Sequence, residues 1–258
     1  MVCAVNFRAK SVGRTKIDDN SRVVLDHQAL HRIDLSGRKL AQFSSTACRF
    51  EASRFEGAEI ESASFGAGRA VSEYVDCSFD RARIHFGPGG CARFVRCSFR
   101  DVDLRDWYCF AVELVDCAFS GRLRKAVFNG TVPDRERTTA GRERNEFRGN
   151  DFSAMDLVDV AFRTGIDLRQ QRLPSGSKYV YLPDAANAIQ RTRAEIIVWN
   201  DLGLRRTAMA LIKSLEDEAA GGQRQLLLRP DAYAGVPKEA VDAVFASLRG
   251  SAGAPSGP

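Results

Sequence analysis

Cysteine and histidine are the residue types in this chain that most readily suggest chemistry. Cys77, Cys97 and Cys117 recur every twenty residues, and His27 and His31 stand four apart. Thiolate and imidazole groups bind zinc, but a zinc site takes three or four converging ligands, and the chain has no CxxC pair. Phosphate-loop and GxSxG motifs are also missing from the sequence. We therefore expect reduced, buried cysteines, no metal, no cofactor, no catalytic residue and no enzymatic activity.

The segments around these cysteines are near-copies of one another and read YVDCSF, FVRCSF and LVDCAF. Large apolar residues recur in them, and in longer runs on both sides, at steps of five. A helix requires steps of three and four and a strand steps of two, so each five-residue unit is a turn-like element that buries its apolar residue only by stacking. The predicted core of the stack includes Phe79, Phe99, Phe119, Cys77, Cys97 and Cys117.

Several five-residue units resemble those of the pentapeptide-repeat family, among them CSFDR, CSFRD, VDLRD, NDFSA and MDLVD. The resemblance covers roughly residues 23–173. It implies a right-handed square β-helix with four units per coil. The fold class that we expect is mainly β, a right-handed square β-helix (solenoid) of about six coils, followed by a small helical C-terminal segment.

The register of the repeat divides the chain into four parts. Residues 1–22 are an N-terminal lead-in or cap, 23–173 the β-helix with an inserted loop at 121–144, 174–250 a helical domain or cap, and 251–258 a disordered tail. Within the helical part, Asp184 is the predicted N-cap of the first helix. RQLLLRP indicates a short strand, and Val241, Val244, Phe245 and Leu248 define the apolar face of the last helix.

Outward positions twenty residues apart alternate in charge, which predicts columns of ion pairs between neighbouring coils. Residues 23–173 contain 23 Lys/Arg and 22 Asp/Glu. This balance argues against an acidic, DNA-like surface and against a continuous phosphate-binding track. The predicted columns are Glu73–Arg93–Glu113, Asp76–Arg96–Asp116, Asp80–Arg100, Arg81–Asp101 and Arg83–Asp103.

Two features are candidates for binding a partner. One is the aromatic side of the solenoid around Trp107 and Tyr108, whose rings either fold inward to replace missing core residues or form an exposed patch. The other is the loop 121–144, since long loops in compact solenoids are often functional. Its basic residues are Arg122, Arg124, Lys125, Arg135, Arg137, Arg142 and Arg144.

The function that these features favour is that of a non-catalytic interaction scaffold or adaptor for another protein. The alternative, implied by the family resemblance, is a DNA-mimicking protein of the quinolone-resistance type that binds a type II topoisomerase such as gyrase. We expect no membrane partner and no direct nucleic-acid binding, and the C-terminal helices offer a surface for a homodimer. The lack of an apolar signal segment and the Arg-rich composition indicate a cytoplasmic, bacterial protein.

Overall fold

The computed structural model describes residues 14–18, 21–68, 70–87 and 90–251, which form two compact units. The solenoid unit runs to Val160 and includes Arg169–Pro174. The helical unit consists of Ala161–Leu168 and the chain from Ser175 onward. The predicted lead-in 1–22 and tail 251–258 lie largely outside the described residues.

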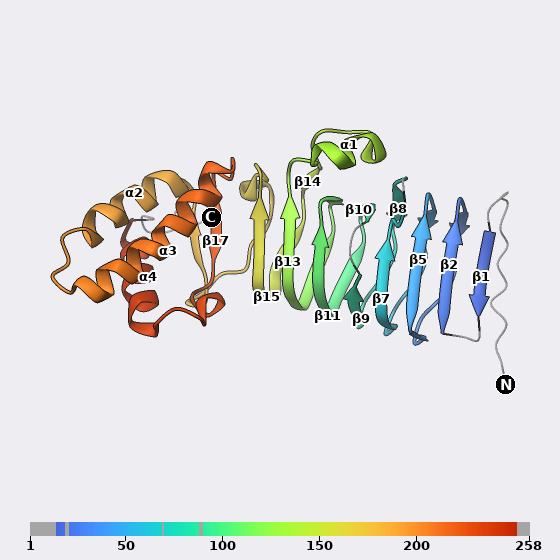
Figure 1. Ribbon diagram of the computed structural model, residues 1–258. Helices are drawn as coiled ribbons and strands as arrows, with labels where there is room; N and C mark the ends of the chain where they lie inside the picture. The colour runs from blue at the N-terminus through green and yellow to red at the C-terminus, as the bar shows by residue number, and fades with distance from the viewer. Residues whose placement is uncertain (1–13, 19–20, 69, 88–89, 252–258) are drawn as a thin grey trace. The chain divides into compact units, whose positions relative to one another are not determined.

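The protein is mainly β, and its larger unit is a parallel β-solenoid of about five turns, which confirms the expected fold class (Figure 1). One sheet has the strand order β1 (Arg14–Asp18), β2 (Arg22–Asp26), β5 (Gln42–Thr46), β7 (Glu59–Phe65), β9 (Arg83–Phe86), β11 (Ser98–Cys109), β13 (Ala118–Asn129) and β15 (Asp151–Arg163), and β4 (Lys39–Leu40) also pairs with β7. The second sheet has the order β14 (Phe147–Arg148), β12 (Ala111–Val115), β10 (Cys91–Val95), β8 (Ser72–Val75), β6 (Arg49–Glu51) and β3 (Ala29–His31).

The register of the strands follows the repeat. Phe94 lies beside Leu114 and Tyr74 beside Phe94, an offset of twenty residues, whereas Phe50 pairs with Tyr74 across an offset of 24. This longer turn accounts for the slip in the sequence register. The antiparallel pairing of β1 with β2 ends the parallel stack on its N-terminal side.

The five-residue step is explained by the corners of the solenoid. Residues with positive φ recur five apart, as in Arg96, Asp101 and Asp106, with φ values of 51°, 54° and 59°. Each such residue reverses the inward and outward alternation of the strand and turns the chain. Asp tolerates this left-handed conformation better than most residues, because its short polar side chain bonds locally.

The core consists of columns of stacked side chains. The rings of Phe79, Phe99 and Phe119 are buried, with centroids 4.6 Å apart between the first two and 4.8 Å between the last two, and they lie within 6° of parallel. Phe55 and Phe152 extend the column at 4.7 and 4.5 Å. Each ring therefore contacts equivalent rings in the turns before and after it.

One core position departs from the expected pattern. Ser45 stands where a large apolar residue is expected, opposite Phe65, and it is fully buried. Its hydroxyl lies 2.6 Å from the hydroxyl of Tyr74 and accepts a hydrogen bond from the Gly66 amide. Phe43, two residues earlier, fills the interior in its place. The buried Ser–Tyr pair is tolerated because the two hydroxyls satisfy each other.

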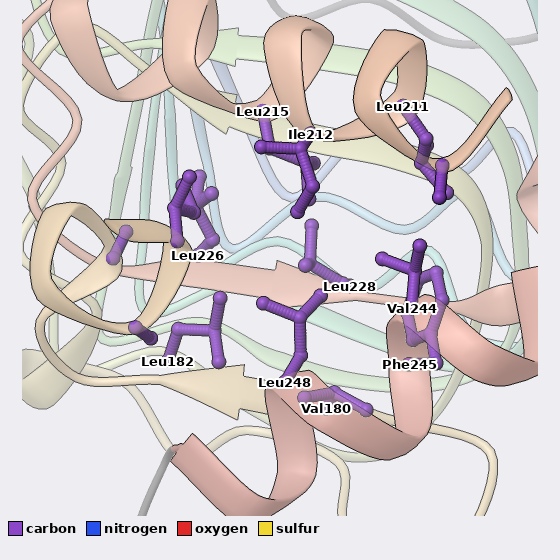
Figure 2. Close-up of a cluster of buried hydrophobic side chains, with 14 of the residues drawn as sticks. Val180, Leu182, Leu211, Ile212, Leu215, Leu226, Leu228, Val244, Phe245 and Leu248 are labelled. Carbon is purple, nitrogen blue, oxygen red and sulfur yellow. The ribbon is translucent and has the colours of Figure 1, made fainter. Parts of the chain in front are cut away.

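The helical unit packs three helices around a two-stranded antiparallel sheet (Figure 2). Val244, Phe245 and Leu248 lie on the buried face of the last helix as the spacing indicates, and Asp184 caps the first by accepting from the Asn187 amide. The strand expected in RQLLLRP also forms. The elements are β16 (Val180–Leu182), α2 (Ala185–Ile196), α3 (Leu202–Ala220), β17 (Leu226–Leu228), the 3₁₀ turn η2 (Pro230–Tyr233) and α4 (Lys238–Ser251), while the 3₁₀ turn η1 (Leu168–Gln170) lies at the division between the units.

Residues 161–168 belong to the helical unit because two buried glutamines hold their backbone. Gln223 accepts hydrogen bonds from the amides of Gly165 and Ile166 at 3.0 and 3.1 Å, and Gln225 accepts one from Leu168 at 3.0 Å. Within the described residues no helix has the length and apolar character needed to span a membrane.

Candidate partner-binding surface

The predicted insertion 121–144 begins later than the sequence indicates. β13 continues to Asn129, and Leu123, Ala126 and Phe128 are buried in the solenoid core. The chain leaves the repeat only over residues 130–146, which we call the excursion and which contains the helix α1 (Asp134–Ala140). The early boundary was wrong because the core residues of this turn do not match the simple five-residue count.

Three of the seven basic residues therefore lie on the solenoid wall. Arg122 pairs with Asp156 at 3.1 Å, and Arg124 donates to both carboxylate oxygens of Asp103 at 2.8 and 3.0 Å. Lys125 is exposed at a corner with φ 57°. Arg122 and Arg124 stabilise the contact between turns and are therefore part of the stacking rather than of a loop.

The excursion is a folded element with a small core of its own. Val132 and Ala140 pack on Cys91 and Ala111 of the solenoid, with Val71 at the edge. α1 ends at Gly141, whose φ of 67° is the left-handed conformation that closes many helices. The helix is visible at the edge of the solenoid near β13 and β14 in Figure 1.

A buried carboxylate holds the excursion in place. Glu113 has a side chain only 7% exposed and lies 2.8 Å from Arg93 and 3.1 Å from Arg142. Arg93 also bonds Glu146 at 2.7 Å, and Arg148 bonds the other oxygen of Glu146 at 2.5 Å. Hydrogen bonds from Arg148 and then Arg93 lower the pKa of Glu146, and burial lowers the pKa of Arg142. Of the predicted column Glu73–Arg93–Glu113, the Arg93–Glu113 pair forms and anchors the excursion, whereas Glu73 pairs with Arg49.

Two arginines of the excursion serve its own structure. Arg142 donates to the carbonyl oxygens of Ala140 and Ala111 at 3.2 and 3.0 Å. Arg137 bonds the Val132 carbonyl at 3.2 Å and pairs with Asp134 at 3.0 Å. Arg135 and Arg144 are exposed, so the seven predicted basic residues do not form one surface.

Both alternatives for the aromatic side are realised, each by different residues. Trp107 is buried and stacks on Phe86 with ring centroids 4.2 Å apart, so its assignment as a partner-contacting residue is wrong. Tyr108 and Phe110 point outward, with 43% and 39% of their surface exposed. The guanidinium of Arg135 lies 5.3 Å above the Phe110 ring. We call Tyr108, Phe110 and Arg135 the aromatic patch.

The electrostatic setting of the patch is mixed. Partial burial, followed by the nearby carboxylates of Asp159 and Asp106, raises the pKa of Tyr108, so its hydroxyl stays a hydrogen-bond donor at neutral pH. Cation–π contact holds the flexible Arg135 side chain over Phe110 and reduces the entropy that binding would otherwise cost. The arrangement is suited to contact with a protein surface.

A second group of exposed apolar residues lies in the helical unit. Ile197, Val198 and Leu202 are 54%, 74% and 67% exposed at the connection between α2 and α3. Trp199, which lies between them, packs on the helical core. We call these three exposed residues the apolar tip. The tip was not predictable from the sequence, because its residues continue the apolar pattern of α2 and α3.

The thiols of the cysteine column point into the solenoid and donate to backbone carbonyl groups. The thiol of Cys97 donates to the Tyr74 carbonyl at 3.3 Å, and that of Cys117 to the Phe94 carbonyl at 3.5 Å. Burial raises the pKa of Cys97 well above its ordinary value, so the thiol is a poor nucleophile. Among the described residues, no group of three or more His, Cys, Asp or Glu could hold a metal ion.

The column Asp76–Arg96–Asp116 forms in part. Arg96 makes two hydrogen bonds to Asp76, at 2.7 and 2.8 Å. Asp116 instead pairs with Arg148 of the next turn at 3.2 Å. A column therefore consists of separate pairs rather than of a continuous ladder.

Two other expected pairs are replaced. Arg81 pairs with Glu56 of the turn before it at 3.1 Å, and no ion pair joins it to Asp101 among the described residues. Asp80 accepts a hydrogen bond from the backbone amide of Arg100 at 2.8 Å, with no ion pair to its guanidinium recorded among the described residues. A long side chain has several possible partners at similar distances, so the sequence spacing alone does not determine which ion pair forms.

Comparison with known proteins does not extend these observations, because no protein-family model, no curated protein and no solved structure matches the chain.

Proposed function

We propose that this protein is a non-catalytic, pentapeptide-repeat scaffold of the cytoplasm that binds another protein through the aromatic patch. The observation that carries the proposal is the exposure of Tyr108 and Phe110. They are the only exposed large apolar side chains among the described residues of the solenoid unit. Tyr and Arg, together with Trp, are the residue types that dominate the binding energy of protein interfaces.

The position of the patch supports the proposal in a second way. Tyr108 and Phe110 flank the end of β11, and Arg135 comes from α1, which is anchored by the Glu113 network. A surface built on such an anchored framework is ordered before binding and loses little conformational entropy in the complex.

The test is an affinity purification with the full chain and with two matched variants, followed by calorimetry with the recovered partner. Tyr108→Ser combined with Phe110→Ser should abolish binding. The control, Ile197→Ser combined with Val198→Ser, removes a similar exposed apolar area from the helical unit and should leave binding unchanged. Loss of binding in the control but not in the patch variant would assign the interface to the apolar tip.

Sedimentation of the same control variant tests the homodimer expected through the C-terminal helices.

The topoisomerase alternative has less support. DNA mimicry requires a continuous acidic face, whereas the carboxylates of Asp76, Asp103 and Glu113 are paired with arginines. A gyrase supercoiling assay, with and without a quinolone, decides this alternative: unchanged supercoiling at saturating protein rules it out, and inhibition or protection would replace the scaffold proposal.

A further inference from the structure

The outer face of the solenoid has a hollow of about 560 Å³ that shares no residue with the aromatic patch. Charged and titratable side chains from four strands line it. Its volume lies within the range of small-molecule sites. The lining residues on which the inference rests are Lys39, Glu59, Glu61, Arg83, His85 and Arg105.

The carboxylates that lie opposite or beside the two arginines have other partners. Glu59, opposite Arg83 on β7, pairs with Lys39 at 3.5 Å. Asp103 lies opposite Arg83 in the parallel register, but its carboxylate is held by both hydrogen bonds from Arg124. Asp106 follows Arg105 and pairs with His85 at 3.0 Å. No ion pair in the described part of the chain joins Arg83 or Arg105 to a carboxylate. Two guanidinium groups therefore face the hollow with unused donors.

The remaining acids make the hollow unsuitable for a polyanion. Glu59 lies 3.5 Å from Lys39, and Glu61 has no recorded ion pair among the described residues. Lys39, Arg83 and Arg105 against Glu59 and Glu61 leave a net charge of +1 on these five residues of the hollow. A nucleic-acid strand would bring several phosphates and would be repelled by both glutamates.

A β-bulge places Glu61 in the hollow. Ile60 pairs with Ile84 and Ala63 with Phe86, so β7 has two residues where β9 has only His85. Both extra residues of β7 are exposed as a result. Bulges of this kind redirect side chains and are over-represented next to functional sites.

We propose that this hollow binds the phosphate monoester of a small polyhydroxylated molecule, such as a sugar phosphate. Arg83 and Arg105 lie on adjacent strands and are diagonal neighbours, because Arg105 is opposite His85, two residues beyond Arg83. Side chains as long as arginine span such a diagonal, so that both guanidinium forks reach one phosphate group. The three terminal oxygens of a phosphate suit two forks better than the two oxygens of a carboxylate. Glu61 accepts hydrogen bonds from hydroxyl groups of the same ligand, which its unpaired carboxylate is free to do.

The experiment is calorimetric titration of the full chain with glucose 6-phosphate, inorganic phosphate, glucose and a single-stranded oligonucleotide as probes. Glucose 6-phosphate should bind saturably, inorganic phosphate more weakly and glucose not at all. Arg83→Gln and Arg105→Gln should each weaken binding about tenfold, the equivalent of one lost charge-assisted hydrogen bond. Glu61→Gln should weaken binding of glucose 6-phosphate but not of inorganic phosphate, which has no hydroxyl donors to lose.

Arg100→Gln is the matched control, because Arg100 is an exposed arginine of β11 that does not line the hollow and has no recorded ion pair among the described residues. Circular dichroism verifies that all variants are folded. Equal affinity in the Arg83, Arg105 and Arg100 variants, or no saturable binding of the phosphate ester, would overturn the proposal. So would equal affinity for inorganic phosphate and glucose 6-phosphate, which defines a bare anion site, or oligonucleotide binding that depends on the same arginines.

Discussion

Phe79, Phe99 and Phe119 occupy the same position in successive turns of the solenoid, whereas Leu182 and Phe245 of the helical core come from a strand and a helix far apart in sequence. In the solenoid the stacked rings contact equivalent rings of neighbouring turns, and several charged residues on the surface, such as Arg96 and Asp76, pair between turns. In the helical unit the core converges from all sides, and the connection between two helices remains apolar and exposed. A repeated core therefore places equivalent residues of successive turns side by side, while a convergent core brings together residues that are unrelated in sequence.

The largest expected effect tests the core columns themselves. Phe99→Ala should lower the free energy of unfolding by about 3–5 kcal/mol, because the cavity lies between two stacked rings that cannot close it. Phe245→Ala, at a fully buried position of the helical unit, should cost a similar amount. The chain has two tryptophans. Trp199→Phe leaves Trp107 as a fluorescent reporter of the solenoid, and Trp107→Phe leaves Trp199 for the helical unit. If Phe99→Ala leaves the free energy of unfolding of the solenoid unchanged, the stacked columns do not stabilise the solenoid.

Substitution of two glycines by alanine distinguishes the energetic cost of backbone strain from that of a steric clash. Gly66 of the solenoid and Gly222 of the helical unit have similar φ values, 99° and 91°. A Cβ on Gly66 would lie 1.9 Å from the Cys91 carbonyl oxygen, whereas a Cβ on Gly222 meets nothing within 4 Å. Gly222→Ala should cost about 1–2 kcal/mol, and Gly66→Ala roughly 3 kcal/mol or more, by urea unfolding. Equal losses would mean that the turns of the solenoid can separate at little cost.

Disrupting the Glu113 network should lower the stability of the solenoid by a smaller amount. Glu113→Gln should destabilise the solenoid by about 2–3 kcal/mol, because Arg93 and Arg142 lose the charge that compensates their partial burial. Asp217→Asn breaks the exposed pair with Lys213 in the helical unit and should leave stability unchanged. Comparable melting temperatures for both variants would contradict the anchoring role of Glu113.

Lowering the pH should decrease the stability of the solenoid unit and increase that of the helical unit. In the solenoid, hydrogen bonds from Arg96 lower the pKa of Asp76, and those from Arg148 and Arg93 lower that of Glu146, below ordinary values of 3.8 and 4.5. Their contribution to stability is complete above those values and is lost as the pH falls through the lowered pKa values. In the helical unit, burial raises the pKa of Glu218 above 4.5 despite the attraction of Arg163. That contribution is complete below 4.5 and is lost as the pH rises through the raised pKa.

Urea unfolding of the two single-tryptophan variants at pH 7 and pH 3 measures this contrast. The solenoid should lose stability at pH 3. The Glu218→Gln variant should remove the opposing pH dependence of the helical unit and leave that of the solenoid unchanged. Parallel behaviour of the two units, with or without Glu218, would contradict the assignment.

The sequence alone determined the elements whose signal is local. A five-residue period excludes helices and ordinary strands and requires stacking, so the Phe99 column and the buried Cys97 position were predictable. The N-cap Asp184 and the apolar face of α4 follow from helical spacing in the same way. These features are determined by backbone geometry, which depends on residues close together in the chain.

Only the tertiary structure decided which distant side chains meet. Phe43 fills the core position that Ser45 leaves empty, and Asp103 pairs with Arg124 instead of Arg83. Two buried glutamines bind the backbone amides of residues 165–168. In the tertiary structure Trp107 also points inward and Tyr108 outward. The physical reason is that several partners lie within reach of each long side chain, and small differences in packing and hydrogen bonding among distant residues determine which contact forms.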